Sequence, residues 1–404
     1  MGFFSKKAAP APAAPRAKAP SSPALIAITG LGLACHAGDQ PYELISSMLG
    51  QISGVKLSRS HKIKSKRNNT YAMVRMAPVE EIADIRAQVR MNQLTTTALS
   101  NAEAALPVDV APEKLLIVIM VEPDLIMHKN EINPQYLQRH IVDEIPRLAT
   151  AIFCILPNNA GSSSSALRTA IAELNEGTWQ AVIFGGADSL IAMEACQKLH
   201  QADRLYVVGK RAGIAPGEGA AFVVLQSAES AKTNTRPALA YLRGLGVAPE
   251  PNARDSDLEA TEGLSSAINQ AITQAGITAT DIQGIVHNLG AETVQSLEWY
   301  QTTQTIWPRR ISEQQRMAVQ LGEIERADLP DDPIPQTILP YMTMGYLGAA
   351  ALPMHLATAL SWMEYDARQA RWGFAVRKHL LVCDTPDAPE RGALIISTTL
   401  ATAT

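Results

Sequence analysis

Continuous apolar runs alternate along the chain with segments whose apolar residues follow helical spacing. The runs at 115–123 (LLIVIMVEP) and 150–158 (TAIFCILPN) show no polar alternation, which is typical of strands buried on both faces. Further apolar runs at 24–35, 179–190 and 216–226 carry glycines at or near their ends. Strands with helices between them predict an α/β protein with mostly parallel sheets.

The second part of the chain repeats this pattern. A strand is predicted at 238–247, an amphipathic helix at 256–276, and a strand ending in Gly290 at 282–290. Residues 336–363 predict a strand, a glycine turn and a helix of small residues, and two apolar runs, KHLLVCDT and GALIISTTL, follow.

Each half contains a strand that leads into a turn rich in Gly, Ala and Ser and then into a helix. These segments are NNAGSSSSALRTAI in the first half and MGYLGAAALPMHL in the second. Two such helices at equivalent places suggest a central helical layer between two sheets. We therefore predict two similar halves, at 24–235 and 236–404.

Composition is that of a large globular protein. The 404 residues are 47% hydrophobic and 18% charged, enough for one large or two medium domains. The net charge of −4 predicts no general attraction to nucleic acid or membranes. The apolar stretch Ala349–Leu360 contains Pro353 and His355 and is too short to span a bilayer, so we expect a cytoplasmic protein.

Two segments are basic. Residues 1–23 are rich in Ala and Pro and carry Lys6, Lys7, Arg16 and Lys18, so we predict a disordered, extended tail. Residues 55–73 carry a run of six cations, which favours a solvated loop, with docking of an acidic partner as the alternative.

The cysteines and histidines show no metal-ligand spacing. The four cysteines are scattered, without a CxxC pair: Cys35, Cys154, Cys196 and Cys383. We predict that Cys154 and Cys383, which lie inside apolar runs, are buried inert thiols, and we predict no disulfide framework, no metal and no cofactor. His36 and His355 lie beside apolar stretches and are predicted to be ordinary packed or surface histidines.

Four stretches together resemble the thiolase-fold β-ketoacyl synthases. ITGLG (28–32) resembles the first strand and turn of that family, and AGSSSSALRTAIAELNEGTWQAVIFGGADS (160–189) resembles its nucleophile helix and the following strand. PGEGAAFVVL (216–225) is similar to the family's GEGAG strand, and MGYLGAAAL (344–352) to its Gly-His…Gly-Ala-Ala turn. Their order and spacing, from about residue 24 to the end, imply a five-layer αβαβα fold and a dimer.

The catalytic positions of this family do not match. Counting from the following glycines, Ala160 replaces the nucleophilic Cys, or Gly161 does if the turn is shifted by one residue. Leu289 stands at the place of the first His, with His287 two residues earlier. Tyr341 and Tyr346 stand at the places of the Lys and the second His.

The family's gating loop is also missing, because DTPDAPERG (384–392) stands where Gly-Phe-Gly-Gly is expected. Decarboxylative condensation needs a thiolate and donors that stabilise the enolate and the oxyanion. A leucine side chain offers no donor, and tyrosine hydroxyls extend farther into a pocket than imidazoles. We therefore expect that no catalytic residue of the family reaction remains and that Ala160→Cys alone does not restore it.

A serine could replace the missing nucleophile. Ser162 is the strongest candidate in the run 162–165, and His287 is the base that the family layout places nearby. No acidic residue can be assigned to orient that base, so helix capping and close packing are the favoured roles of the serines. Asp188 and Glu218 are predicted to hydrogen-bond to the backbone.

Three functions remain as hypotheses. The favoured one is a catalytically inactive protein that acts through protein contacts, such as an adaptor of a secretion system, because LLIVIMVEPD (115–124) is similar to ketosynthase-like accessory proteins of type VI secretion. The second is a chain-length-factor-type subunit that pairs with an active ketosynthase and an acyl carrier protein in polyketide or fatty-acid-like biosynthesis. The third is a divergent acyltransferase with a serine nucleophile.

The state of the acyl tunnel separates the first two hypotheses. An open tunnel beside the dimer interface favours the chain-length-factor type. A tunnel filled by Tyr341, Tyr346 or Met344 favours the adaptor.

Overall fold

The computed structural model describes ten stretches of the chain. These are 25–64, 70–82, 86–121, 133–157, 163–234, 237–251, 261–308, 310–325, 329 and 333–398. The predictions for the tail (1–23) and for Ala160, Gly161 and Ser162 lie outside these residues.

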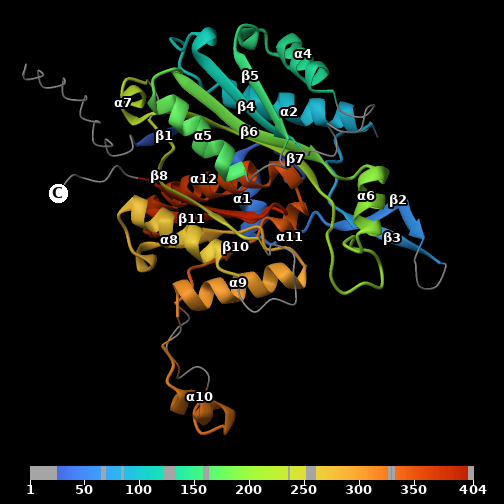
Figure 1. Ribbon diagram of the computed structural model, residues 1–404, viewed down its shortest axis with the longest axis vertical. Helices are drawn as coiled ribbons and strands as arrows, with labels where there is room; N and C mark the ends of the chain where they lie inside the picture. The colour runs from blue at the N-terminus through green and yellow to red at the C-terminus, as the bar shows by residue number, and fades with distance from the viewer. Residues whose placement is uncertain are drawn as a thin grey trace, which may run out of the picture.

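Within the described residues, ten strands form one sheet in the order β10-β9-β11-β12-β8-β1-β7-β6-β4-β5 (Figure 1). The first half of the chain contributes β1 (Ile26–Cys35), β4 (Leu115–Val121), β5 (Ile152–Pro157), β6 (Ala181–Ser189) and β7 (Glu218–Ser227). The second half contributes β8 (Ala240–Pro249), β9 (Gly284–Val286), β10 (Thr337–Ile338), β11 (His379–Asp384) and β12 (Glu390–Ser397). The halves are joined where β1 pairs with β8.

The second half repeats the first strand for strand. The order β1-β7-β6-β4-β5 corresponds to β8-β12-β11-β9-β10. In both halves the first two pairings are antiparallel and the last two are parallel. The repeat of two similar halves in the predicted fold is therefore confirmed, whereas the bounds 24–235 and 236–404 stay a prediction.

The prediction of mostly parallel sheets is wrong, because the sheet is mixed. β7 and β12 run antiparallel to both of their neighbours. Nearly every residue of these strands is buried, since helices cover both faces of the sheet. An antiparallel strand covered on both faces loses its polar alternation and cannot be told from a parallel one by pattern.

Helices form three layers around the two halves of the sheet. α2 (Ala87–Glu103) packs on the outer face of the first half, and α8 (Gly263–Ala275) packs on β8 and β12 of the second half. α5 (Ser163–Asn175) and α12 (Ala351–Gln369) each contact strands of both halves, so the halves face each other across these two helices. This arrangement is the predicted five-layer αβαβα fold.

Small residues allow the central helices to approach the sheet. A Cβ added at Gly392 of β12 would lie 1.9 Å from Ser164 Oγ at the start of α5. A Cβ at Gly186 of β6 would lie 2.5 Å from the carbonyl oxygen of Ala349, just before α12. The small residues of both turns therefore have a packing role, whatever chemistry they once supported.

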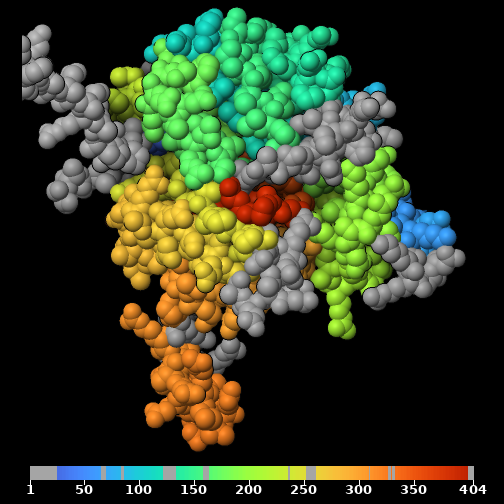
Figure 2. Space-filling model, in the orientation of Figure 1, coloured from blue at the N-terminus to red at the C-terminus, as the bar shows by residue number. Residues whose placement is uncertain are grey.

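Two segments extend from this body. β2 (Lys56–Lys64) and β3 (Tyr71–Met76) form a two-stranded ribbon that contacts α6 (Met193–Gln201). α10 (Glu313–Gln320) projects from the second half as a separate lobe, and none of its residues is buried (Figures 1 and 2).

The remaining helices are shorter or peripheral. They are α1 (Pro41–Leu49), α4 (Pro134–Glu144), α7 (Ala228–Ala231), α9 (Thr293–Ile306) and α11 (Tyr341–Met344). None of the helices in the described part of the chain is long and apolar enough to cross a membrane.

Candidate functional site

The second half gathers four of the predicted positions in one region. His287 and Leu289 follow β9, Tyr341 begins α11, and Tyr346 comes directly after it. A Cβ added at Gly290 would lie 3.5 Å from Cε2 of Tyr341, so the segment after β9 packs against α11. The region therefore holds the side chains that the sequence aligns with family catalytic groups.

His287 is buried and has no hydrogen-bond partner on either ring nitrogen, although its backbone N–H donates to Ile338 O at 3.1 Å. Its ring stacks on Trp299 of α9, with centroids 4.5 Å apart. Burial lowers the pKa of His287 to about 3, with smaller contributions from nearby His355 and Arg391. The imidazole is therefore neutral, and no described carboxylate orients it as a base.

The described serine with the most defined contacts is not activated by His287. Ser164 Oγ donates to Asp384 Oδ2 at 2.8 Å, and Ser164 N donates to the same oxygen at 3.1 Å. Burial raises the pKa of Asp384 to about 6, although the hydrogen bonds from Ser164 oppose the shift. Ser164 thus caps α5 against β11, and the structure does not bring it to His287.

The hydroxyl of Tyr341 forms hydrogen bonds with two backbone groups. Its Oη accepts from Ala215 N and donates to Gly213 O, both at 2.9 Å, and the side chain is 5% exposed. Burial raises the pKa of Tyr341 to about 12. Leu289 offers no donor, so neither residue presents a free polar group that could stabilise an enolate.

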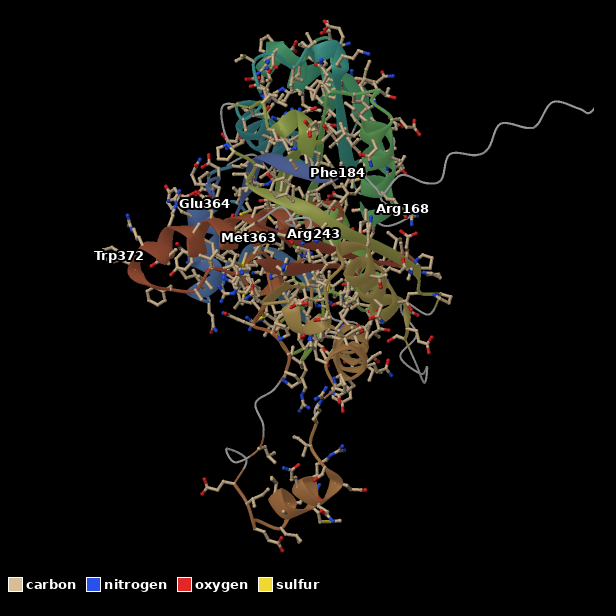
Figure 3. All side chains as sticks on the ribbon, turned by 90° about the vertical axis from the view of Figure 1, so that its left-hand side faces the viewer. Arg168, Phe184, Arg243, Met363, Glu364 and Trp372 are labelled. Atoms are coloured by element: carbon tan, nitrogen blue, oxygen red, sulfur yellow. The ribbon has the colours of Figure 1, made fainter. Side chains whose placement is uncertain are left out.

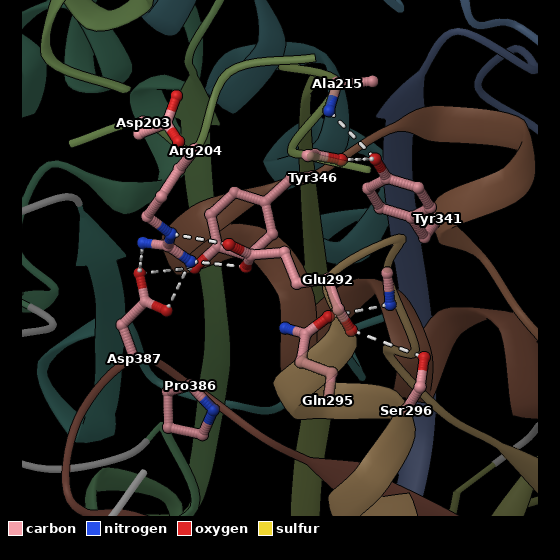
Figure 4. A network of polar contacts seen from close by, with 12 residues as sticks. Asp203, Arg204, Ala215, Glu292, Gln295, Ser296, Tyr341, Tyr346, Pro386 and Asp387 are labelled. Atoms are coloured by element: carbon pink, nitrogen blue, oxygen red, sulfur yellow. Dashed lines mark hydrogen bonds and ion pairs between the residues drawn. The ribbon is translucent and has the colours of Figure 1, made fainter. Parts of the chain in front are cut away.

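Tyr346 belongs to a polar network around Arg204 (Figure 4). Arg204 donates to both carboxylate oxygens of Glu292, at 2.8 and 2.6 Å, and to both of Asp387, at 2.8 and 3.0 Å. Tyr346 Oη donates to Asp387 Oδ2 at 3.4 Å. We call Arg204, Glu292 and Asp387 the clamp.

The clamp joins three distant parts of the chain. Arg204 follows α6, Glu292 precedes α9, and Asp387 lies in the turn between β11 and β12 that replaces the gating loop. Burial disfavours the charge on Arg204, but its hydrogen bonds to the two carboxylates outweigh this effect and raise the arginine pKa. The clamp therefore holds this turn against the first half of the chain.

A polar cavity of about 290 Å³ lies beside the clamp. Its lining includes Gln295, Thr385 and Arg391, and Arg391 forms a buried ion pair with Glu298 at 2.6 Å. His287 and Tyr341 do not line it. The cavity is thus lined by the clamp and its neighbours, and not by His287 or Tyr341.

The other polar residues singled out in the sequence have structural partners. Asp188 Oδ2 accepts from Ala349 N at 3.0 Å and Glu218 Oε1 accepts from Val79 N at 2.6 Å, as predicted. Glu218 also pairs with Arg90 of α2, which the sequence did not reveal. The imidazole of His355 is buried and lies 3.1 Å from the carbonyl oxygen of Cys383, a packed histidine as predicted.

Known structures share this architecture. No family model matches the sequence, and no curated protein matches it. The structure of the ishigamide ketosynthase/chain length factor is 16% identical over 93% of this chain and 100% of its own, with a TM-score of 0.68. The chain has the ketosynthase fold.

Two further ketosynthase structures agree. A type II polyketide synthase acyl-carrier protein in complex with its ketosynthase bound to the hexaketide is 13% identical over 94% of this chain and 100% of its own, with a TM-score of 0.68. A ketosynthase in complex with its chain length factor from Xenorhabdus doucetiae is 14% identical over 93% and 98%, with a TM-score of 0.64. These identities establish the fold alone.

On this ketosynthase fold, no described thiol is suited to nucleophilic attack. Cys35, Cys196 and Cys383 are buried, and burial raises the pKa of each, to about 12 for the first two. Cys154 is partly buried, and its pKa is also raised by burial. A thiolate is the reactive form, so these thiols are inert.

In the described stretches, we find no group of three or more His, Cys, Asp or Glu side chains that could hold a metal ion. The sequence did not predict the clamp. The one sequence feature that could have indicated the clamp is the acidic, proline-rich segment DTPDAPERG, which stands where the family's glycine-rich gating loop is expected.

Proposed function

We propose that this protein is a non-catalytic ketosynthase-fold subunit that acts through contacts with other proteins. The main support is that the candidate polar groups have structural roles. The hydroxyl of Tyr341 bonds two backbone groups, Ser164 bonds Asp384, and His287 is neutral with no orienting partner. A general base or oxyanion donor needs a free group aimed at the substrate.

The partner we propose is a second thiolase-fold chain. Related folds include a ketosynthase with its chain length factor and a ketosynthase with its acyl-carrier protein. Among the described strands only β4 pairs with β5, which makes β5 an edge strand, and its sequence IFCILP is apolar. Ile152 is 48% exposed on this edge, and an open apolar edge is normally covered by pairing.

Affinity purification of the tagged, full-length chain from its native cell tests this proposal. Co-purification of an active ketosynthase supports the chain-length-factor type. Ile152→Lys should then weaken the complex at least about tenfold, because one desolvated lysine charge costs more than 1.4 kcal/mol. Val108→Lys, which alters a residue 97% exposed and outside β5, is the matched control and should leave binding unchanged.

A second assay tests catalytic inactivity directly. The purified complex is incubated with acyl and malonyl thioesters, and the intact mass of this chain is measured. We expect no acyl adduct. A stable acyl group on a residue of the 162–165 run would overturn inactivity and support the serine acyltransferase hypothesis.

The second candidate function is an adaptor, without acyl chemistry, that belongs to a secretion system. It is favoured by the clamp, which holds the turn that replaces the gate, and by free positive charge on the β2–β3 ribbon. Arg59, Lys62 and Lys64 are exposed on β2 and form no ion pair with described residues. Co-purification of secretion components or a toxin, without a ketosynthase, would favour the adaptor.

A further inference from the structure

A groove of about 840 Å³ lies far along the sheet from β5, where the two halves separate. Residues 29–33 of β1 line it. Ala104 and Ala105, which directly follow α2, line it as well, and α12 contributes Met363, Glu364 and Ala367. Figure 3 shows Met363 and Glu364 on α12 near α1, which contacts α12.

The floor of the groove is a sheet edge without a strand partner. β1 pairs with β7 over its whole length but with β8 only at Ile26–Ile28. The register then shifts between Ile28 and Gly30, and Leu239 N makes a last hydrogen bond to Ile28 O at 2.8 Å. From Gly30 to Leu33, no described strand pairs with the second edge of β1.

The described segment that leads into β8 does not continue the pairing on this edge. Pro237, which lines the groove before β8, has no backbone N–H to donate. In a sheet, alternate residues direct their N–H and C=O groups to each edge, so part of the backbone of Gly30–Leu33 points toward the groove, where Leu31 is partly exposed and the other three residues are buried. Thr29 at the bulge is 6% exposed, and its hydroxyl has no hydrogen-bond partner.

The groove has the shape of a slot for one strand. α2 lies directly on β1, because a Cβ at Gly32 would come within 1.9 Å of Ala98 O. α12 contacts β1 as well. The side walls carry apolar groups, including Leu31, Leu360 and Met363. A segment between these walls would extend the sheet while its side chains pack against helices.

The rim of the slot is acidic. Glu364 pairs with Arg368 at 2.5 Å, whereas exposed Asp39 forms no ion pair with a residue that the structure describes. One negative charge is therefore uncompensated among the lining residues. Charge complementarity then favours an occupant with a Lys or Arg at the Asp39 end.

We propose that an extended segment of a partner protein binds here by adding a strand to β1 at Gly30–Leu33, with small apolar side chains toward the helices and a basic residue beside Asp39. Main-chain hydrogen bonds would supply affinity, and the walls would supply specificity. This inference goes beyond the proposed function, because it needs no second thiolase-fold chain and no acyl group.

Selection from a phage-displayed library of random octapeptides tests the proposal on the immobilised full chain. Ala367→Trp fills the slot from an exposed position on α12 and serves for counter-selection. Ala370→Trp, also exposed but outside the groove lining, is the matched control. Fluorescence polarisation then measures the affinity of a selected peptide for each protein.

Two N-methylated forms of that peptide probe the hydrogen bonds. One carries methyl groups on its odd amides and the other on its even amides. Only one set of amides can face β1. We expect one form to lose at least about tenfold in affinity and the other to bind like the parent. Ala367→Trp should cost a similar factor, Asp39→Asn a smaller one, and Ala370→Trp nothing.

Three results would overturn the proposal. Selection might return no peptide that distinguishes the wild type from Ala367→Trp, or both N-methylated forms could bind as well as the parent. In the third result, a chain ending at Thr398, which lines the groove, binds the peptide at least tenfold more tightly than the full chain. That result would assign the slot to this chain's own C-terminal residues.

Discussion

Replacing His287 with phenylalanine removes a buried imidazole that has no hydrogen-bond partner and keeps an aromatic ring against Trp299. Loss of the unsatisfied polar atoms favours the variant by about 1–3 kcal/mol. The slightly larger ring opposes this gain by a packing cost of similar size. Both effects are independent of pH, so the sign of the change at neutral pH is not the test.

The pH dependence isolates the imidazole. The folded-state pKa of His287 is about 3, below the ordinary histidine value of 6.5 that applies to the unfolded chain. As the pH falls below 6.5, His287 binds a proton in the unfolded state but not in the folded state. The free energy of unfolding of the wild type therefore falls until the pH reaches the folded-state pKa. At pH 5 this loss is about 2 kcal/mol, whereas at pH 7.5 it is nearly zero.

Urea unfolding of both proteins at pH 7.5 and pH 5 measures this difference. The free energy of unfolding of His287→Phe minus that of the wild type should rise by about 2 kcal/mol at the lower pH. Ile285→Val, on the same buried strand, is the control: it should cost about 1 kcal/mol at both pH values. A rise below about 0.5 kcal/mol would show that His287 is not held neutral by burial.

Three further predictions concern the candidate site. Tyr341→Phe should lower the free energy of unfolding by about 1–3 kcal/mol in urea titrations, because Gly213 O and Ala215 N lose a buried partner. An unchanged free energy of unfolding would show that these hydrogen bonds do not stabilise the fold and that the hydroxyl is available for chemistry. Arg204→Ala should cost about 2 kcal/mol by the same assay, because the largely buried Glu292 keeps its charge without a partner. Ala160→Cys should yield no carbon–carbon bond formation from acyl and malonyl thioesters, and measurable product would show that one position alone was limiting.

Much of the fold could be predicted because its signals are local. Apolar runs such as LLIVIMV became β4, and the two small-residue turns led into α5 and α12. Strand direction was not predictable in the same way. β7 and β12 are covered by helices on both faces, which removes the alternation that marks an antiparallel strand.

The candidate site divides along similar lines. Motif order placed His287, Leu289 and Tyr341 in one region, because each follows a recognisable strand or turn. The clamp could not be predicted, because Arg204 lies 88 positions from Glu292 and 183 from Asp387. Ion pairs between residues far apart in the sequence produce no local sequence pattern, because only the tertiary fold brings the charged side chains together.

The clamp also explains why restoring a nucleophile would not be enough. To admit a substrate past the turn between β11 and β12, the chain would have to separate Asp387 from Arg204 and Tyr346. Separating Arg204 from Glu292 as well would leave largely buried charges unpaired, at about 1–3 kcal/mol for each lost partner. In the non-catalytic function proposed above, missing donors and a closed turn would reinforce each other, since a centre that stabilises no oxyanion gains nothing by opening. Selection on such a chain acts on its packing and its surfaces, and the β5 edge and the β1 slot are where those surfaces lack a partner.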